Sequence, residues 1–263
     1  KTIFKTNNYL FNLQRTKNES IIAFQSGINL YEYDDNKKSI IQVTNFINND
    51  KKTKQTTTLL EKQQNNLFSY FSNNRSSSTK NNGLKKQFLG KGEISKIQIS
   101  PDRRVIALRV IENPKKTTTK VPSYITKNGY TQTKSARPKV SDIEPNQKLG
   151  IYNVVEDSLH WVNFSSLKDI RKIPSYLSNT KIQKNKKTLF KKDRAIFIHQ
   201  LEFNNLNNKA LIDIRSADNK DRWIVSLNTT TFKWEEIEHQ HDEAWIGGPG
   251  ISAWNMVNGT IGW

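Results

Sequence analysis

The chain has 263 residues and a formal net charge of +18, from 42 Lys and Arg against 24 Asp and Glu. A hydrophobic content of 34% and an aromatic content of 10% are enough to bury a core, which argues against a wholly disordered chain. The absence of Cys excludes disulfides, a thiolate nucleophile and Cys-ligated zinc, and no apolar run reaches the roughly 18–20 residues of a membrane-spanning helix.

Short β-branched and aromatic runs, each ended by turn residues, dominate the chain and predict an all-β protein. The first unit, about residues 10–45, contains the runs IIAF, NLYEY and SIIQV, separated by polar turns. Four strands in each unit and a unit spacing of about 40 residues are typical of the four-stranded antiparallel blades of a β-propeller. We therefore expect residues 10–45 to form a first blade.

A basic insertion follows, over about residues 46–92. Residues 51–140 hold about 20 Lys and Arg against about 4 Asp and Glu, so most of the net charge lies in about a third of the chain. The run TLLEKQQNNLFSY at 58–70 predicts a short amphipathic helix between polar loops. Clustered cations could also bind nucleic acid, but no RNA- or DNA-binding motif accompanies them, so a solvated surface is expected instead.

The second blade is expected at about 93–164, interrupted by a long insertion at 113–147. Prolines at positions 114, 122, 138 and 145 favour an excursion outside the sheet, where partner or substrate contacts are expected. Within the blade, period-two alternation predicts two sets of side chains on opposite faces. The first set is Ile97, Ile99, Val105 and Ala107, and the second, expected to point outward, is Gln98, Arg104 and Ile106.

A third blade is expected at about 195–238, and the start of a fourth at about 245–263. Three blades and part of a fourth are fewer than a ring of four to eight requires, so we interpret the chain as an incomplete propeller from a longer protein. Tryptophans recur in or beside the expected strands, where core packing is their expected role. They are Trp161, Trp223, Trp234, Trp245, Trp254 and Trp263.

No catalytic residue is expected in this chain. The G-x-S-x-G pattern of an activated serine is absent, because Ser252 is followed by Ala and Trp instead of a second Gly. His239 and His241 would face the same side of a strand, as metal ligands could. No second His or Cys cluster completes such a site, so a hydrogen-bonded loop is favoured and neither a metal nor another cofactor is expected.

Three side chains are candidates for binding a peptide. A carboxylate of Asp242 or Glu243 could meet the ammonium group of a peptide N-terminus. The planar guanidinium of Arg137 suits a carboxylate or a carbonyl group, although an ion pair with Asp142 or Glu144 is the alternative.

Five stretches of the sequence carry a resemblance to a known family: SPDR at 100–103, YITKNGY at 124–130, ARPKV at 136–140, QKLGIY at 147–152 and HDEAWIGGPG at 241–250. Together they resemble the dipeptidyl peptidase IV branch of the prolyl oligopeptidase serine peptidases. The similarity extends over roughly residues 10–263 and departs from the family at Arg103, where a Gly is usual. The Glu235 and Glu236 pair, in the context KWEEIEH, differs from the family's substrate-binding Glu-Glu motif.

The resemblance implies the non-catalytic N-terminal propeller of a secreted or periplasmic serine exopeptidase. Such a propeller gates and orients peptide substrates for an α/β-hydrolase domain of the same polypeptide, which this chain does not contain, and a homodimer is possible. The alternative is a stand-alone propeller that acts as a scaffold for protein or polyanionic partners.

Overall fold

The computed structural model describes residues 9–48, 83–112, 118–136, 145–172, 192–204 and 208–247, with the backbone of 255–257 and 260–262. Every regular element in these residues is a β-strand, so the predicted all-β class is confirmed, while the predicted helix at 58–70 lies outside them. Over the same residues no helix is long and apolar enough to cross a membrane. The strands are β1 (Phe11–Arg15), β2 (Ile21–Ser26), β3 (Asn29–Asp34), β4 (Ser39–Gln42), β5 (Phe46–Ile47), β6 (Gln87–Phe88), β7 (Glu93–Ile99), β8 (Val105–Glu112), β9 (Thr119–Ser123), β10 (Gln132–Ala136), β11 (Asn146–Asn153), β12 (Ser158–Trp161), β13 (Ile196–Phe203), β14 (Lys209–Ser216), β15 (Asp221–Asn228), β16 (Trp234–His241), β17 (Asn255–Val257) and β18 (Thr260–Gly262).

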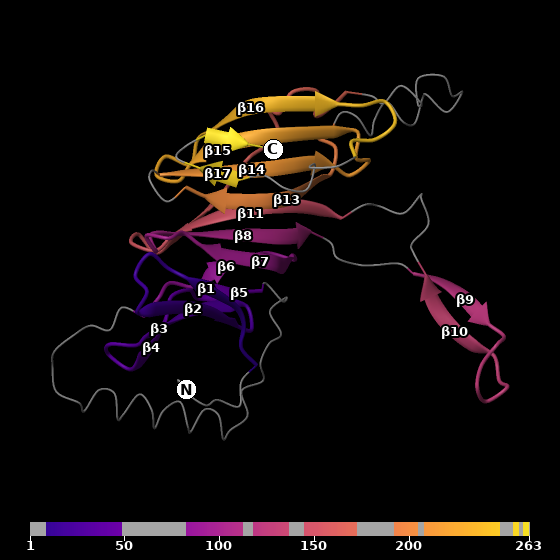
Figure 1. Ribbon diagram of the computed structural model, residues 1–263, viewed down its shortest axis with the longest axis horizontal. Coiled ribbons are helices and arrows are strands. Elements are labelled where there is room, and N and C mark those ends of the chain that lie inside the picture. Colours follow the sequence, from indigo (N-terminus) through magenta and orange to yellow (C-terminus); the bar gives the residue numbers. More distant parts are fainter. Residues whose placement is uncertain are drawn as a thin grey trace, which may run out of the picture.

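Twelve of these strands form three four-stranded antiparallel sheets, as the sequence predicts. Their orders are β1-β2-β3-β4, β12-β11-β8-β7 and β13-β14-β15-β16. The sheets are stacked in chain order, with the first at the indigo end and the third at the orange end of Figure 1. Polar turns join most neighbouring strands of these sheets, because an antiparallel pair can be closed by a tight connection; β8 and β11 are the exception.

The second sheet is interrupted by an insertion that does not disturb its pairing. Strands β8 and β11 pair along their whole length, from Glu112 opposite Asn146 to Val105 opposite Asn153. Residues 118–136 of the intervening chain include the β9–β10 hairpin, which projects away from the stacked sheets (Figure 1). Pro122 lies in this hairpin, where its missing N–H interrupts no ladder of the main sheet.

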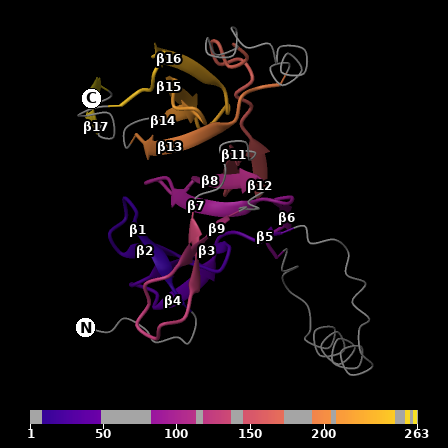
Figure 2. The ribbon, with the colours of Figure 1, turned by 90° about the vertical axis from the view of Figure 1, so that its right-hand side faces the viewer.

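Two hydrophobic clusters lie between the sheets. The cluster between the first and second sheets includes Leu30 and Ile106, and the cluster between the second and third includes Ala107 and Trp223. The middle sheet is therefore buried on both faces, and Figure 2 shows it between the other two.

Burial on both faces corrects the predicted alternation in the second sheet. Ile106 was expected on the outward face but is fully buried. Ile97 and Ile99 share its cluster, because they pair with Leu108 and Ile106 across the sheet, whereas Val105 and Ala107 face the third sheet.

The tryptophans divide between core and surface. Trp223 is fully buried, as expected, but Trp245 is 72% exposed, so the expectation of core packing is wrong there. Trp161 is 39% exposed and holds the ammonium of Lys148 at 4.3 Å from its ring centroid. Trp234 packs against the edge of a core cluster and donates a hydrogen bond to the carbonyl of Asn163. Trp254 and Trp263 lie outside the described residues.

The turn that resembles the family's Ser-Pro-Asp-Gly sequence keeps a left-handed residue despite the substitution. Arg103 has φ of 62°, the conformation that Gly adopts most easily. The Ser100 hydroxyl bonds the Asp102 carboxylate at 2.6 Å and accepts from the Val105 N–H at 3.0 Å, which holds the turn closed. The guanidinium of Arg103 reaches Glu32 at 3.1 Å, so this side chain links the second sheet to the first.

The edge strand β7 is bonded by side chains of the first sheet. The amide groups of Asn12 and Gln14 donate to the carbonyl of Ile97 at 2.6 and 2.9 Å. The Gln14 side-chain oxygen accepts from the Ile99 N–H at 2.8 Å. These bonds use backbone groups of an edge strand that the ladder within its own sheet leaves unpaired.

The edge strand β13 is bonded in the same way by the second sheet. The side-chain oxygens of Asn146 and Gln147 each accept a hydrogen bond at 3.0 Å, from the N–H groups of Ile196 and Ile198. Arg109 donates to the carbonyl of Ile198 at 2.8 Å. Both inter-sheet junctions thus combine an apolar cluster with side-chain bonds to an edge strand.

Candidate functional site

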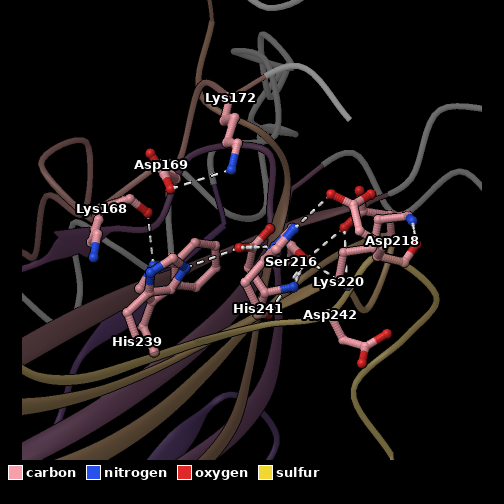
Figure 3. Close-up of polar contacts among 12 residues, drawn as sticks. Lys168, Asp169, Lys172, Ser216, Asp218, Lys220, His239, His241 and Asp242 are labelled. Atoms are coloured by element: carbon pink, nitrogen blue, oxygen red, sulfur yellow. Dashed lines mark hydrogen bonds and ion pairs between the residues drawn. The ribbon is translucent and has the colours of Figure 1, made fainter. Parts of the chain in front are cut away.

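One end of the third sheet carries charged side chains around a buried carboxylate (Figure 3). Asp221, at the start of β15, lies opposite His241 of β16, and Trp223 lies opposite His239. Residues two apart on a strand point to the same side of the sheet, so both imidazoles reach the same place. Asp221 is only 1% exposed.

Three cationic or potentially cationic side chains surround this carboxylate. Its Oδ1 lies 2.9 Å from Nε2 of His239 and 2.8 Å from Nδ1 of His241. Its Oδ2 lies 2.6 Å from Nη2 of Arg194, and Nη1 of the same guanidinium lies 3.5 Å from Oδ2 of Asp218. We call these five residues the Asp221 cluster.

Neighbouring groups fix the orientation of the cluster. The ring of Trp223 stacks on His239 with centroids 5.6 Å apart and an interplanar angle of 8°, and its Nε1 donates to the Lys168 carbonyl at 2.9 Å. Ser216 donates to Asp218 at 2.6 Å and accepts from the Asp221 N–H at 3.0 Å. Figure 3 shows these contacts between the strands and the segment that carries Lys168.

The contacts shift two pKa values in opposite directions. Burial raises the pKa of Asp221, but hydrogen bonds from His239, Arg194 and His241 outweigh it and hold the pKa below its usual range. The hydrogen bond to Asp221 raises the pKa of His241 above its usual value. The cluster therefore favours an ionised carboxylate beside a protonated His241.

The two carboxylates expected to meet a peptide N-terminus have different surroundings. Asp242 Oδ1 accepts hydrogen bonds from the N–H groups of Ala244 at 2.7 Å and Trp245 at 3.2 Å, so it orders its own turn. The Glu243 carboxylate lies 3.4 Å from Nε2 of His241, and its carbonyl accepts from the Lys220 ammonium. The structure thus brings Glu243 to the edge of the Asp221 cluster, while Arg137 lies outside the described residues.

Glu235 and Glu236 make contacts within the protein that are structural in kind. Glu236 accepts from the Lys168 N–H at 2.9 Å, and Glu235 lies 3.9 Å from the Lys209 ammonium. Within the described part of the chain, no group of three or more His, Asp or Glu residues is placed to hold a metal ion. Ser252 lies outside that part.

Sequence reasoning did not find Asp221 or Arg194. Asp221 belongs to an ADNKDR turn, where an acidic residue is unremarkable, and Arg194 precedes the third sheet by only two residues. The pair of histidines was the one available signal, and their common partner could be identified only from the pairing of β15 with β16.

We predict that replacing His241 with Gln weakens the protein more at low pH than at high pH. The raised folded-state pKa means that the stabilisation by His241 is fully present below its unfolded pKa, about 6.5, and is lost as pH rises through the folded-state value. Urea unfolding of both proteins at about pH 5.5 and about pH 9 measures the difference. A difference in unfolding free energy that stays constant or grows with pH would contradict this assignment.

No protein-family model matches the chain, and no curated protein matches it in sequence. Among solved structures, the chain is similar to dipeptidyl peptidase 4 from Porphyromonas gingivalis, with a TM-score of 0.56 and 10% identity over 98% of this chain. A protein from Bacteroides ovatus assigned as a dipeptidyl aminopeptidase IV matches 90% of the chain, with a TM-score of 0.44 and 11% identity.

The matched region is a minority of each solved protein. The chain spans 29% of the Porphyromonas gingivalis protein and 25% of the Bacteroides ovatus protein. At this level of identity the likeness concerns the fold. The resemblance indicated by the sequence motifs therefore holds at the level of the fold, since the chain is similar almost throughout to part of a dipeptidyl peptidase 4.

Proposed function

We propose that the chain is an incomplete β-propeller from a serine exopeptidase of the dipeptidyl peptidase type. Its role would be to gate and orient peptides for an α/β-hydrolase domain that is absent from this chain. The supporting observation is the fold match over 98% of the chain, which coincides with the motif resemblance over roughly residues 10–263. The stacked four-stranded sheets fit a succession of blades at about 10–45, 93–164 and 195–238, with a fourth beginning at about 245.

In this proposal the peptide N-terminus lies near Glu243. The Glu243 side chain is 63% exposed, so its carboxylate can form an ion pair with an ammonium group. Nε2 of His241 lies 3.4 Å from the same carboxylate and helps to position it. Asp242 would contribute mainly by shaping the turn, since its Oδ1 already accepts two backbone hydrogen bonds. Arg137, from the insertion of the second blade, is proposed to hold a substrate carbonyl or carboxylate.

The proposed setting is the periplasm or the exterior of the cell, where this branch of peptidases acts on peptides. A homodimer is also part of the proposal. The second candidate, a scaffold that binds protein or polyanionic partners, is favoured by the concentration of positive charge in residues 51–140.

We predict that this chain alone does not react with a fluorophosphonate serine probe, whereas the product of the complete reading frame does. The reason is that an activated serine needs a base and an elbow, and this chain has no G-x-S-x-G sequence. The measurement is in-gel fluorescence after labelling, with hydrolysis of a dipeptidyl chromogenic substrate as a second readout.

Heat-denatured protein controls for nonspecific labelling. Labelling of the isolated chain at Ser252 would contradict the assignment of a non-catalytic region. A complete product that neither labels nor hydrolyses the substrate would favour the scaffold function instead.

A further inference from the structure

The opposite face of the third sheet carries a second charged group, unrelated to the Asp221 cluster. Asp213, in β14, is fully buried, and its Oδ2 lies 3.1 Å from Nε of Arg222 and 3.4 Å from Nη2 of Arg215. His199, on the edge strand β13, approaches the same oxygen through Nδ1 at 3.6 Å. A single carboxylate thus faces two guanidinium groups and an imidazole.

Two further cations come from the second sheet. Arg109, in β8, donates through Nη1 to the carbonyls of Ile198 and His199 at 2.8 and 3.1 Å, which places its guanidinium beside His199. Lys96 lies opposite Arg109 in the β7–β8 ladder. Among the residues that the structure describes, no carboxylate forms an ion pair with Lys96 or Arg109.

The Nε and Nη2 groups of the Arg109 guanidinium indicate which kind of ligand could bind. Its two backbone bonds use Nη1 only, so Nε and Nη2 have no hydrogen-bond partner in the described residues. These two N–H groups form the planar fork that matches the two oxygens of a carboxylate. Arg109 is half-buried, the adjacent Lys96 is exposed and the His199 side chain is 38% exposed, so the three residues border the solvent-accessible surface.

We propose that Arg109, Lys96 and His199 form a binding site for a carboxylate group at the junction of the second and third sheets. Arg109 would bind the two oxygens, Lys96 would add charge, and the Nε2 of His199 would donate a hydrogen bond. This site goes beyond the proposed function, because it depends only on residues of this chain and on neither a hydrolase domain nor the Asp221 cluster.

The local electrostatics support an anion at this position. Partial desolvation of the Lys96 ammonium lowers its pKa although the residue as a whole is exposed, and the neighbouring Arg109 lowers it further. Burial also lowers the pKa of His199, with an added contribution from Arg215 that exceeds the opposing effect of Asp213. Burial is the larger cause of both shifts, and the added repulsion from Arg109 on Lys96 and from Arg215 on His199 comes from neighbouring cations, which a bound anion would offset.

The test is isothermal titration calorimetry of the 263-residue chain at constant ionic strength. One arm uses succinate, and the other uses a capped peptide with one Glu side chain, compared with the same peptide carrying Gln. Binding of succinate identifies free carboxylates as a source, and binding of the Glu peptide alone identifies peptides. Either result supports the site.

The variants separate the site from general attraction to a basic protein. We expect Arg109→Lys and Lys96→Gln each to weaken binding about tenfold, because each loses one charge-assisted contact or the fork geometry. Lys127→Gln, which removes an exposed charge on the β9–β10 hairpin, should leave the affinity unchanged. Lys96→Gln retains the bonds from Arg109 to β13, so it tests the site even if an Arg109 variant folds poorly.

Two results would overturn the proposal. The first is the absence of binding to both succinate and the Glu peptide. The second is an equal loss of affinity in Lys127→Gln and Lys96→Gln, which would assign the binding to net charge alone.

Discussion

Replacing Trp223 with Ala should lower the free energy of unfolding by about 3–5 kcal/mol, the range for deleting a fully buried aromatic side chain. Trp223 is completely buried in the cluster between the second and third sheets, so its removal leaves a cavity that the paired strands cannot fill. It also stacks on His239 and donates to the Lys168 carbonyl at 2.9 Å. Urea denaturation followed by circular dichroism gives the change.

Two companion variants separate the contributions. Trp223→Phe keeps most of the buried area but loses the indole N–H, so a smaller loss of about 1–2 kcal/mol is expected. Trp245→Ala is the matched control, since Trp245 is 72% exposed and should change stability by less than about 0.5 kcal/mol. Equal losses for Trp223→Ala and Trp245→Ala would refute the packing argument.

The second large effect is expected for Asp221→Asn, which should destabilise the protein by about 3–5 kcal/mol because it removes one partner of a buried ion pair. Arg194 would then face an amide instead of the carboxylate that lies 2.6 Å from it. His239 and His241 would share a weaker acceptor. Thermal and urea unfolding near neutral pH measure the loss.

The pH dependence of the Asp221 contribution provides its own check. Because the folded-state pKa of Asp221 lies below its ordinary value, its stabilisation is present above the unfolded pKa and is lost as pH falls through the folded value. Glu235→Gln is the control, because the Glu235 side chain is 71% exposed and its ion pair with Lys209 is long, at 3.9 Å. An exposed pair of this kind contributes little to stability. A loss below about 1 kcal/mol for Asp221→Asn would show that the cluster contributes little to the fold.

The predictability of each part of the fold depends on how local its determinants are. Turn residues such as Pro101 and Asp102 next to β-branched runs identified the strands, because both signals act within a few residues. The side of the sheet on which the Ile106 side chain lies was not predictable in this way. A strand buried on both faces has no polar side over its first four residues, so VIAL at 105–108 is a continuous apolar run, and alternation cannot assign its residues to one neighbouring sheet or the other.

The candidate site was predictable only in part for a similar reason. His239 and His241 stood out by their spacing, for which a hydrogen-bonded loop was favoured; both lie instead on strand β16, where their rings contact Asp221. Asp221 and Arg194 carry no such signal, because their importance comes from strand pairing and from the approach of the segment before β13. Long-range pairing of this kind is not encoded in the spacing of residues along the chain.

The side chains that form hydrogen bonds with the edge strands β7 and β13 also affect the tendency of the protein to aggregate. An open edge strand offers unpaired N–H and C=O groups to any other strand, including one from a second molecule. Asn12 and Gln14 occupy these groups on β7, and Asn146 and Gln147 do so on β13. Local opening that separates two sheets would expose both apolar surface and a ready template for pairing. Junction residues that contribute modestly to stability can therefore have a large influence on whether a partly opened molecule recloses or aggregates.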